Sequence, residues 1–260
     1  MKKFRFVFIL VLVLDCVVVR ADQINLAEAD ASQEAYKGGF GSGRNGGSGF
    51  GEWKMTNEGH AEKRHAGAYL ATVENNNAIT GIAYHKKAWG LYANGTGFEQ
   101  AVAFRAFTAP LAVGDSFSFL MKTGPFKKKF ETDDPAPGSV GLTLRTSNAT
   151  NAPADYNKDA VFEFSASEGK PDYQIADGSA EEKTDSGVPL NDSGVTVTVT
   201  ITGADSYDVE IQTMNDKQLT KLLGRKLKAA GPITSLAIFN RDSEKNDAYF
   251  NSLQVARENE

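Results

Sequence analysis

The sequence predicts an all-β protein, an antiparallel sandwich of two sheets with about a dozen strands. Apolar and polar residues alternate along most of the chain beyond residue 98, and turn clusters separate the alternating runs at short intervals. Alternation with period two is typical of half-buried strands, and no βαβ pattern interrupts it. We therefore expect one jelly-roll domain over residues 34–256, followed by a short tail at residues 257–260.

The first residues have the pattern of a secretory signal peptide. A basic start and an apolar run precede Val19 and Ala21, the small residues expected three positions and one position before a cleavage site. Asp15 interrupts the run, which is short for a membrane span, so a membrane anchor is the weaker interpretation. We expect residues 1–21 to be removed and residues 22–33 to form a polar lead-in. The product would be periplasmic or extracellular, with no membrane insertion after cleavage.

Charge and cysteine content limit the partners and the means of stabilisation. The chain has 28 basic and 33 acidic residues and a net charge of -5. Nucleic acids and anionic membranes bind basic surfaces, so neither is an expected partner. The single cysteine, Cys16, lies in the predicted signal peptide. The mature chain would then have no disulfide and would depend on its apolar core.

The clearest hairpin lies at residues 195–213. Val195, Val197 and Val199 alternate with threonines, a short Gly/Asp turn follows, and a second alternating run begins at Tyr207. This pattern is typical of two antiparallel strands joined by a tight turn. In chain order, the other strands are expected at residues 51–57, 66–74, 87–95, 98–111, 115–124, 139–147, 160–167, 171–177, 233–242 and 247–255.

One segment, residues 215–230, permits two interpretations. Leu219, Leu222 and Leu223 are spaced as on one face of a helix. Gly224 weakens a helix, and lysines between apolar residues also suit an edge strand that resists aggregation. The strand is the favoured interpretation.

A glycine-rich stretch at residues 38–53 contains the spacing G-x-G-x-x-G, beginning at Gly41. A dinucleotide-binding loop joins a buried strand to a helix, but here more glycines follow and no βαβ unit is present. Nucleotide binding is therefore not expected. We predict a loop with positive φ angles that delivers Phe50 and Trp53 into the core.

Catalytic motifs are scarce in the sequence. It contains no G-x-S-x-G nucleophile motif, and the mature chain would have no cysteine nucleophile. Asp208 and Glu210 share one strand face, as a glycosidase pair could, but that face is polar. We expect these two residues and Glu163 to be solvent-facing charges, although an unrecognised carboxylate pair stays open.

Sugar binding requires aromatic faces beside polar groups. Trp89, Tyr92 and Asn94 lie close together in the sequence, and Arg105 follows on the next expected strand, so these four are the candidate ligand-binding residues. For Trp89 the alternative is a core position. Asp247, at the start of the last strand, is a candidate ligand of a structural calcium, with a solvated turn acid as the alternative. No other cofactor is expected.

Several blocks in this order resemble a group of secreted bacterial modules. The blocks are the glycine-rich stretch and the segments "KAWGLYANG", "VGLTLR", "LAIFN" and "DAYFNSLQV". The chain is similar over residues 34–256 to concanavalin A-like (laminin-G-like) jelly rolls with a glycine-rich start. The resemblance implies a β-sandwich whose last strand pairs near the first, and it transfers no catalytic residues.

Together these observations favour a secreted, non-catalytic module that binds carbohydrate on a cell surface or in the environment. One alternative is a structural or adhesive surface protein that binds other proteins. The other is a glycan hydrolase or lyase with an unrecognised carboxylate pair. Fold class alone does not decide among them, because one fold supports many functions.

Overall fold

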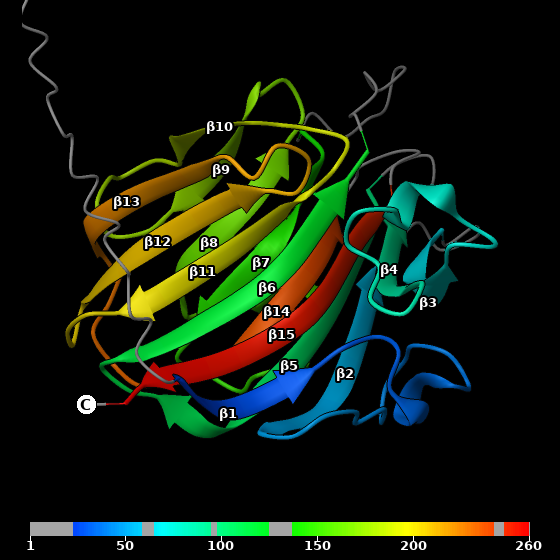
Figure 1. Cartoon of the computed structure of the whole chain (residues 1–260), viewed down its shortest axis with the longest axis horizontal. Coiled ribbons are helices and arrows are strands. Elements are labelled where there is room, and N and C mark those ends of the chain that lie inside the picture. The colour runs from blue at the N-terminus through cyan, green and yellow to red at the C-terminus, as the bar shows by residue number, and fades with distance from the viewer. Residues whose placement is uncertain (1–22, 59–64, 95–97, 125–136, 242–246, 260) are drawn as a thin grey trace, which may run out of the picture.

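A computed structural model of the chain forms a sandwich of two antiparallel sheets (Figure 1). The structure describes residues 23–58, 65–94, 98–124, 137–241 and 247–259. The predicted signal peptide, residues 1–21, lies outside the described residues. Within those described ranges no helix has the length and apolar character needed to cross a membrane.

The first sheet has eight strands, in the order β13-β12-β11-β6-β15-β4-β3, with β1 also paired to β15. Its strands are β1 (Gln23–Ala29), β3 (Ala66–Thr72), β4 (Lys87–Ala93), β6 (Asp115–Thr123), β11 (Val195–Ile201), β12 (Ser206–Thr213), β13 (Leu219–Lys226) and β15 (Ala248–Glu258). In Figure 1 this sheet faces the viewer.

The second sheet has seven strands, in the order β10-β9-β8-β7-β14-β5-β2. Its strands are β2 (Phe50–Glu58), β5 (Gln100–Leu111), β7 (Ser139–Arg145), β8 (Ala160–Ser167), β9 (Asp172–Ala176), β10 (Thr184–Pro189) and β14 (Ile233–Arg241). Three short 3-10 helices, η1 (Glu34–Tyr36), η2 (Asn77–Ile79) and η3 (Pro153–Tyr156), lie in the connections. The predicted all-β sandwich is confirmed.

The predicted hairpin is β11–β12, and it pairs Val197 with Ile211 across the two strands. Residues alternate between buried and half-buried along both strands, as the sequence pattern requires. The ambiguous segment forms β13, an edge strand paired to β12, so its interpretation as a strand is confirmed. Gly224 has φ +65° there, a conformation that a helix would not allow.

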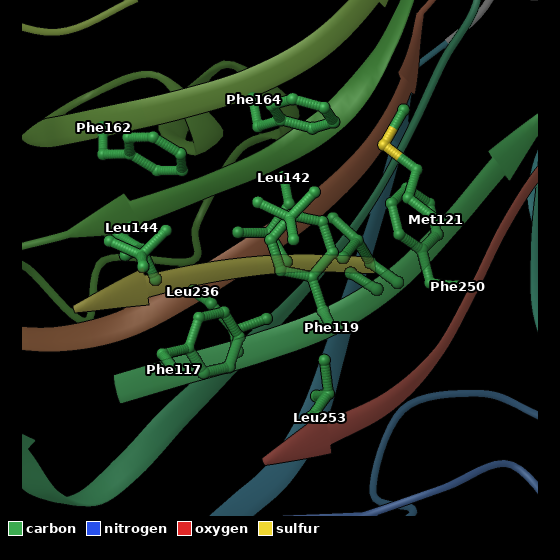
Figure 2. Close-up of a cluster of buried hydrophobic side chains, with 14 of the residues drawn as sticks. Phe117, Phe119, Met121, Leu142, Leu144, Phe162, Phe164, Leu236, Phe250 and Leu253 are labelled. Atoms are coloured by element: carbon green, nitrogen blue, oxygen red, sulfur yellow. The ribbon is translucent and has the colours of Figure 1, made fainter. Parts of the chain in front are cut away.

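The core lies between the two sheets (Figure 2). Phe117, Phe119 and Met121 project inward from β6 and are fully buried. Side chains from both sheets, including Leu142, Phe164, Leu236 and Phe250, surround them in Figure 2. Burying one such side chain stabilises a fold by roughly 1.5–3 kcal/mol. A core of this kind can hold the chain together without a disulfide.

The glycine-rich stretch leads from η1 into β2, as predicted, and Phe50 and Trp53 are both buried. Gly47 and Gly49 have φ angles of +89° and +74°. A Cβ atom on Gly47 would lie 2.0 Å from the backbone oxygen of Glu28. Only glycine fits such a close approach of two backbones at a positive φ.

The domain is longer at both ends than the predicted range of residues 34–256. Residues 22–33 were expected as a polar lead-in, but Gln23–Ala29 form β1, which pairs with the end of β15. The last strand continues through Glu258, so the predicted tail at 257–260 begins inside it. The pairing of first and last strands agrees with the resemblance noted above.

Candidate functional site

Three tyrosines lie together on the outer face of the eight-stranded sheet. Tyr69 of β3 and Tyr249 of β15 both pair with Gly90 of β4, one from each side. Tyr92 lies two residues further along β4 and pairs with Gly67. Since side chains two residues apart share a face, these tyrosines lie on the same face of the sheet, where Tyr249 is buried.

The two glycines create the space in which the rings lie. A Cβ atom on Gly90 would be 2.7 Å from Cε1 of Tyr69, and one on Gly67 would be 2.6 Å from the hydroxyl of Tyr92. Each ring therefore lies over the glycine opposite it. The rings of Tyr69 and Tyr92 are 6.2 Å apart at an angle of 51°. Both tyrosines are half-buried, so part of each ring is accessible.

A carboxylate and an amide join the phenol groups. The hydroxyl of Tyr69 donates to Oδ2 of Asp247, and that of Tyr249 donates to the same oxygen over 3.3 Å. Nδ2 of Asn76 donates to both hydroxyls. Asn76 is itself fixed as the N-cap of η2, where its Oδ1 accepts from the backbone of Ala78. We call Tyr69, Tyr92, Tyr249, Asp247 and Asn76 the tyrosine cluster.

Burial controls the electrostatics of this cluster. Burial raises the pKa of Asp247, and the hydrogen bonds from Tyr69 and Tyr249 offset this only in part. Burial and the hydrogen bond to Asp247 raise the pKa of Tyr69, and burial raises that of Tyr249. No cation pairs with Asp247 in the part of the chain that the structure describes. The hydroxyls of Tyr69 and Tyr249 and the amide of Asn76 donate within the cluster, so what the cluster offers a ligand is the carboxylate of Asp247 and the aromatic faces.

The calcium ligand predicted at Asp247 stays a prediction. Calcium takes 6–8 oxygen ligands, usually with several carboxylates, as is general for this hard cation. Among the described residues no group of three or more histidines, cysteines and acids could hold a metal ion. The polar side chains that contact Asp247 among the described residues are two phenols, and an amide bonds to both of them.

The four predicted ligand-binding residues are divided between core and surface. Trp89 is fully buried and packs edge-on against Trp53 at 5.3 Å, in agreement with its alternative as a core residue. It offers no face to a ligand. Tyr92 belongs to the tyrosine cluster, and Asn94 is exposed just beyond β4, where its backbone N–H donates to His65.

Arg105 also lies inside. Its guanidinium is 5.1 Å from the ring of Trp53, and it donates to the backbone of Gly51 and to Asn45. Burial lowers the pKa of Arg105 to about 10. Arg105 therefore holds the glycine-rich stretch in place and does not join Tyr92 on the surface.

Sequence reasoning selected Tyr92 and Asp247 for separate reasons, and the structure connects them through Tyr69. It missed Tyr69, Tyr249 and Asn76. The available signal was a repeated G-x-Y, at residues 67–69 and 90–92, which places a glycine and a tyrosine on the same face of neighbouring strands.

The carboxylates considered for catalysis are all engaged elsewhere. Asp208 accepts from the backbone of Gly224, and Glu210 pairs with Lys221. Glu163 was expected to face solvent, but it is 3% exposed and pairs with Lys183 at 2.5 Å. The expectation was wrong because both faces of β8 are covered, so the alternation of apolar and polar residues along this strand does not indicate which side chains are exposed.

Comparisons with solved structures give similar β-sandwiches. The carbohydrate esterase vb_24B_21 from the Shiga toxin-encoding bacteriophage phi24B has a TM-score of 0.52 at 12% identity, over 92% of this chain and 100% of that one. A legume lectin-like domain from Entamoeba histolytica has 0.46 at 11%, over 78% and 88%. The Ca2+-bound exoplasmic domain of VIP36 has 0.45 at 9%, over 76% and 86%.

At such identities, the likeness to the phage protein shows a shared fold and nothing more specific. No family model matches the chain, and no curated protein matches it significantly in sequence. The chain is thus an all-β sandwich with a fold similar to that of the phage protein.

Proposed function

We propose that the protein is a secreted, non-catalytic carbohydrate-binding module and that the tyrosine cluster holds the sugar. The observation that supports this most directly is the combination of two half-buried tyrosine rings with Asp247 and Asn76 on one sheet face. Secretion rests on the signal-peptide pattern of residues 1–21.

The chemistry of a sugar suits this arrangement. The C–H face of a pyranose packs against an aromatic ring, as apolar surfaces do, and its hydroxyls need hydrogen-bond acceptors and donors close by. Tyr69 and Tyr92 supply the rings, and Asp247 supplies the acceptor. The glycines beneath the rings let Tyr69 and Tyr92 lie close against the sheet.

Binding without turnover is the preferred form of the proposal. Glycoside hydrolysis generally uses two carboxyl groups that flank the scissile bond. Within the described residues, Asp247 is the one carboxylate that takes part in the cluster. The phage protein with the similar fold is described as a carbohydrate esterase, so product formation is measured in the same experiment.

The test is a titration of residues 22–260 against a glycan panel by calorimetry, with each mixture also analysed for released product. We expect millimolar or tighter binding without turnover, and Tyr92→Ala should weaken it about three- to tenfold. Leu223→Ala, an exposed position on the far edge strand of the same sheet, is the control and should bind normally. Failure of every glycan to bind at about 10 mM would refute the proposal.

A further inference from the structure

We infer a second saccharide site in a hollow beside the middle of β15. The hollow has a volume of about 270 Å³ and is lined by β1, by the loop before β4 and by β15. Its ligand class rests on the proposed function, but its residues are separate from the tyrosine cluster. We call it the β15 hollow and define it by Glu28, Asp30, Tyr84, Ser252 and Gln254.

Tyr84 supplies an aromatic wall. Tyr84 is 50% exposed. Among the described residues, the other exposed large hydrophobic side chains are all aliphatic. His85 packs edge-on against its ring at 4.5 Å, which limits the positions the ring can take. An exposed aromatic ring that stabilises no core and borders a hollow is suited to stacking on a ligand.

The opposite walls supply polar groups. Glu28 uses Oε2 to accept from Asn25, and Asp30 uses Oδ1 to accept from Ser32. The other oxygen of each carboxylate has no hydrogen bond to the described residues, and neither does the side-chain amide of Gln254. Acceptors and an amide around a polar hollow can bind the hydroxyls of one sugar unit. The hollow is slightly smaller than the sites of drug-sized ligands, which span about 300–1,000 Å³.

A buried amide holds the walls together. Asn251 is fully buried, and its Oδ1 accepts from the backbone N–H groups of Ala31 and Ser252, each over 3.0 Å. Its Nδ2 donates to the backbone oxygens of Ile82 and Lys87 over 2.9 and 2.7 Å. One side chain therefore ties together the segments that carry Asp30, Tyr84 and Gln254. A site held in this way loses little conformational entropy when it binds a ligand.

The backbone around the hollow is strained in two of its walls. Ser252 has φ 49°, and His85 and Lys86 have φ 45° and 67°. Non-glycine residues seldom adopt positive φ, and such conformations persist where the surroundings enforce them, often at ligand sites. Here His85 and Lys86 directly follow Tyr84, and Ser252 lies where the register of β15 shifts between Asn251 and Gln254.

The β15 hollow and the tyrosine cluster share two elements. β15 carries Tyr249 and, three residues later, Ser252. The segment between β3 and β4 carries Asn76 of the tyrosine cluster near β3 and Tyr84 of the β15 hollow near β4. A module with both sites would present two separate positions for sugar units, and each position can be tested independently of the other.

The experiment maps ligand-induced shifts in amide NMR spectra of residues 22–260, with mannohexaose, cellohexaose and chitohexaose as probes. At least one probe should shift the side-chain amide of Gln254 and the backbone amide of Ser252. Tyr84→Ala should weaken those shifts by at least about threefold in apparent Kd while leaving shifts at Gly90 intact. Gln254→Ala is the second variant, and Tyr92→Ala should have the opposite pattern.

The outcomes separate the two sites. If Gly90 responds to a probe and the amides of Ser252 and Gln254 do not, the hollow is no saccharide site but the proposed function stands. If the hollow responds equally in wild type and Tyr84→Ala, the inference is overturned. If the hollow responds while Gly90 is silent, the hollow is supported and the tyrosine cluster is not. Silence at both places would overturn both.

Discussion

Asp177 and Asp247 are two carboxylates that accept hydrogen bonds from tyrosine hydroxyls, yet their surroundings differ. Asp177 accepts from Tyr207 and, over 2.7 Å, from the guanidinium of Arg225. Burial alone would raise the pKa of Asp177, but the hydrogen bonds from Arg225 and Tyr207 lower it overall. Asp247 has phenols and no cation among the described residues, and burial raises its pKa.

This difference distinguishes a structural carboxylate from a candidate functional one. Asp177 follows β9 in the seven-stranded sheet, whereas Tyr207 and Arg225 lie on β12 and β13 of the eight-stranded sheet. Their hydrogen bonds join the two layers. Asp247 is less well compensated, and a half-buried carboxylate with an unfavourable pKa shift is typical of sites that bind or react.

The largest expected effect is that of Asp177→Ala on stability. The substitution would leave Arg225, whose side chain is 15% exposed, and the hydroxyl of Tyr207 without their partner. Removing one member of a largely buried ion pair destabilises a protein by about 3 kcal/mol or more. Urea unfolding measures the change, with Asp208→Ala on the polar face of β12 as the control. A loss of less than about 1 kcal/mol in the free energy of unfolding would contradict a structural role for Asp177.

The second expected effect is that of Asp247→Asn on binding. The amide oxygen can still accept from Tyr69, so the free energy of unfolding should change by less than about 1 kcal/mol. The charged acceptor is lost, however, and glycan affinity should fall about tenfold. Calorimetry and urea unfolding on the same preparation separate the two quantities. Unchanged affinity, or instability like that of Asp177→Ala, would make Asp247 structural as well.

A smaller effect is expected for Gly90→Ala, which tests the geometry of the rings. The new methyl group would displace Tyr69 from its position over β4, since the Cβ atom would lie 2.7 Å from the ring. Glycan binding should weaken about threefold, with a modest change in stability. Gly41→Ala, where a Cβ atom meets nothing within 4 Å, is the matched control. Equal affinities in the two variants would show that ring position does not matter.

Alternation predicted the sandwich well because strand periodicity reports which face is buried. It failed at β1, where the buried residues are the small side chains of Ala27 and Ala29 and larger apolar residues are exposed, so no apolar stripe marks the strand. Alternation also predicted the wrong exposure for Glu163, because both faces of its strand are covered.

The candidate site was predicted only in part, for two physical reasons. Trp89 and Tyr92 are three residues apart on one strand and therefore point to opposite faces, so they could not form one surface. Period two alone could have shown this. By contrast, the contact between Tyr69 and Asp247 joins residues 178 positions apart, and it depends on a strand order that no local pattern contains.

The smallest expected effect is an opposite pH dependence of the two carboxylates. The pKa of Asp177 is lowered below its ordinary value of 3.8, so its stabilisation is full above that value and is lost as pH falls through the native pKa. The pKa of Asp247 is raised above 3.8 in the native state. Between 3.8 and the native pKa, the native state therefore binds more protons than the unfolded state, and the free energy of unfolding declines as pH rises through this range.

Unfolding free energies of wild type, Asp177→Asn and Asp247→Asn, measured from about pH 3 to pH 7, separate these contributions. The advantage of wild type over Asp177→Asn should shrink toward the acidic end. Relative to Asp247→Asn, wild type should instead gain stability as the pH falls, with a slope of at most about 1.4 kcal/mol per pH unit for one proton. Parallel curves for the two variants would mean that the carboxylates are equivalent, because opposite pKa shifts cannot give slopes of the same sign.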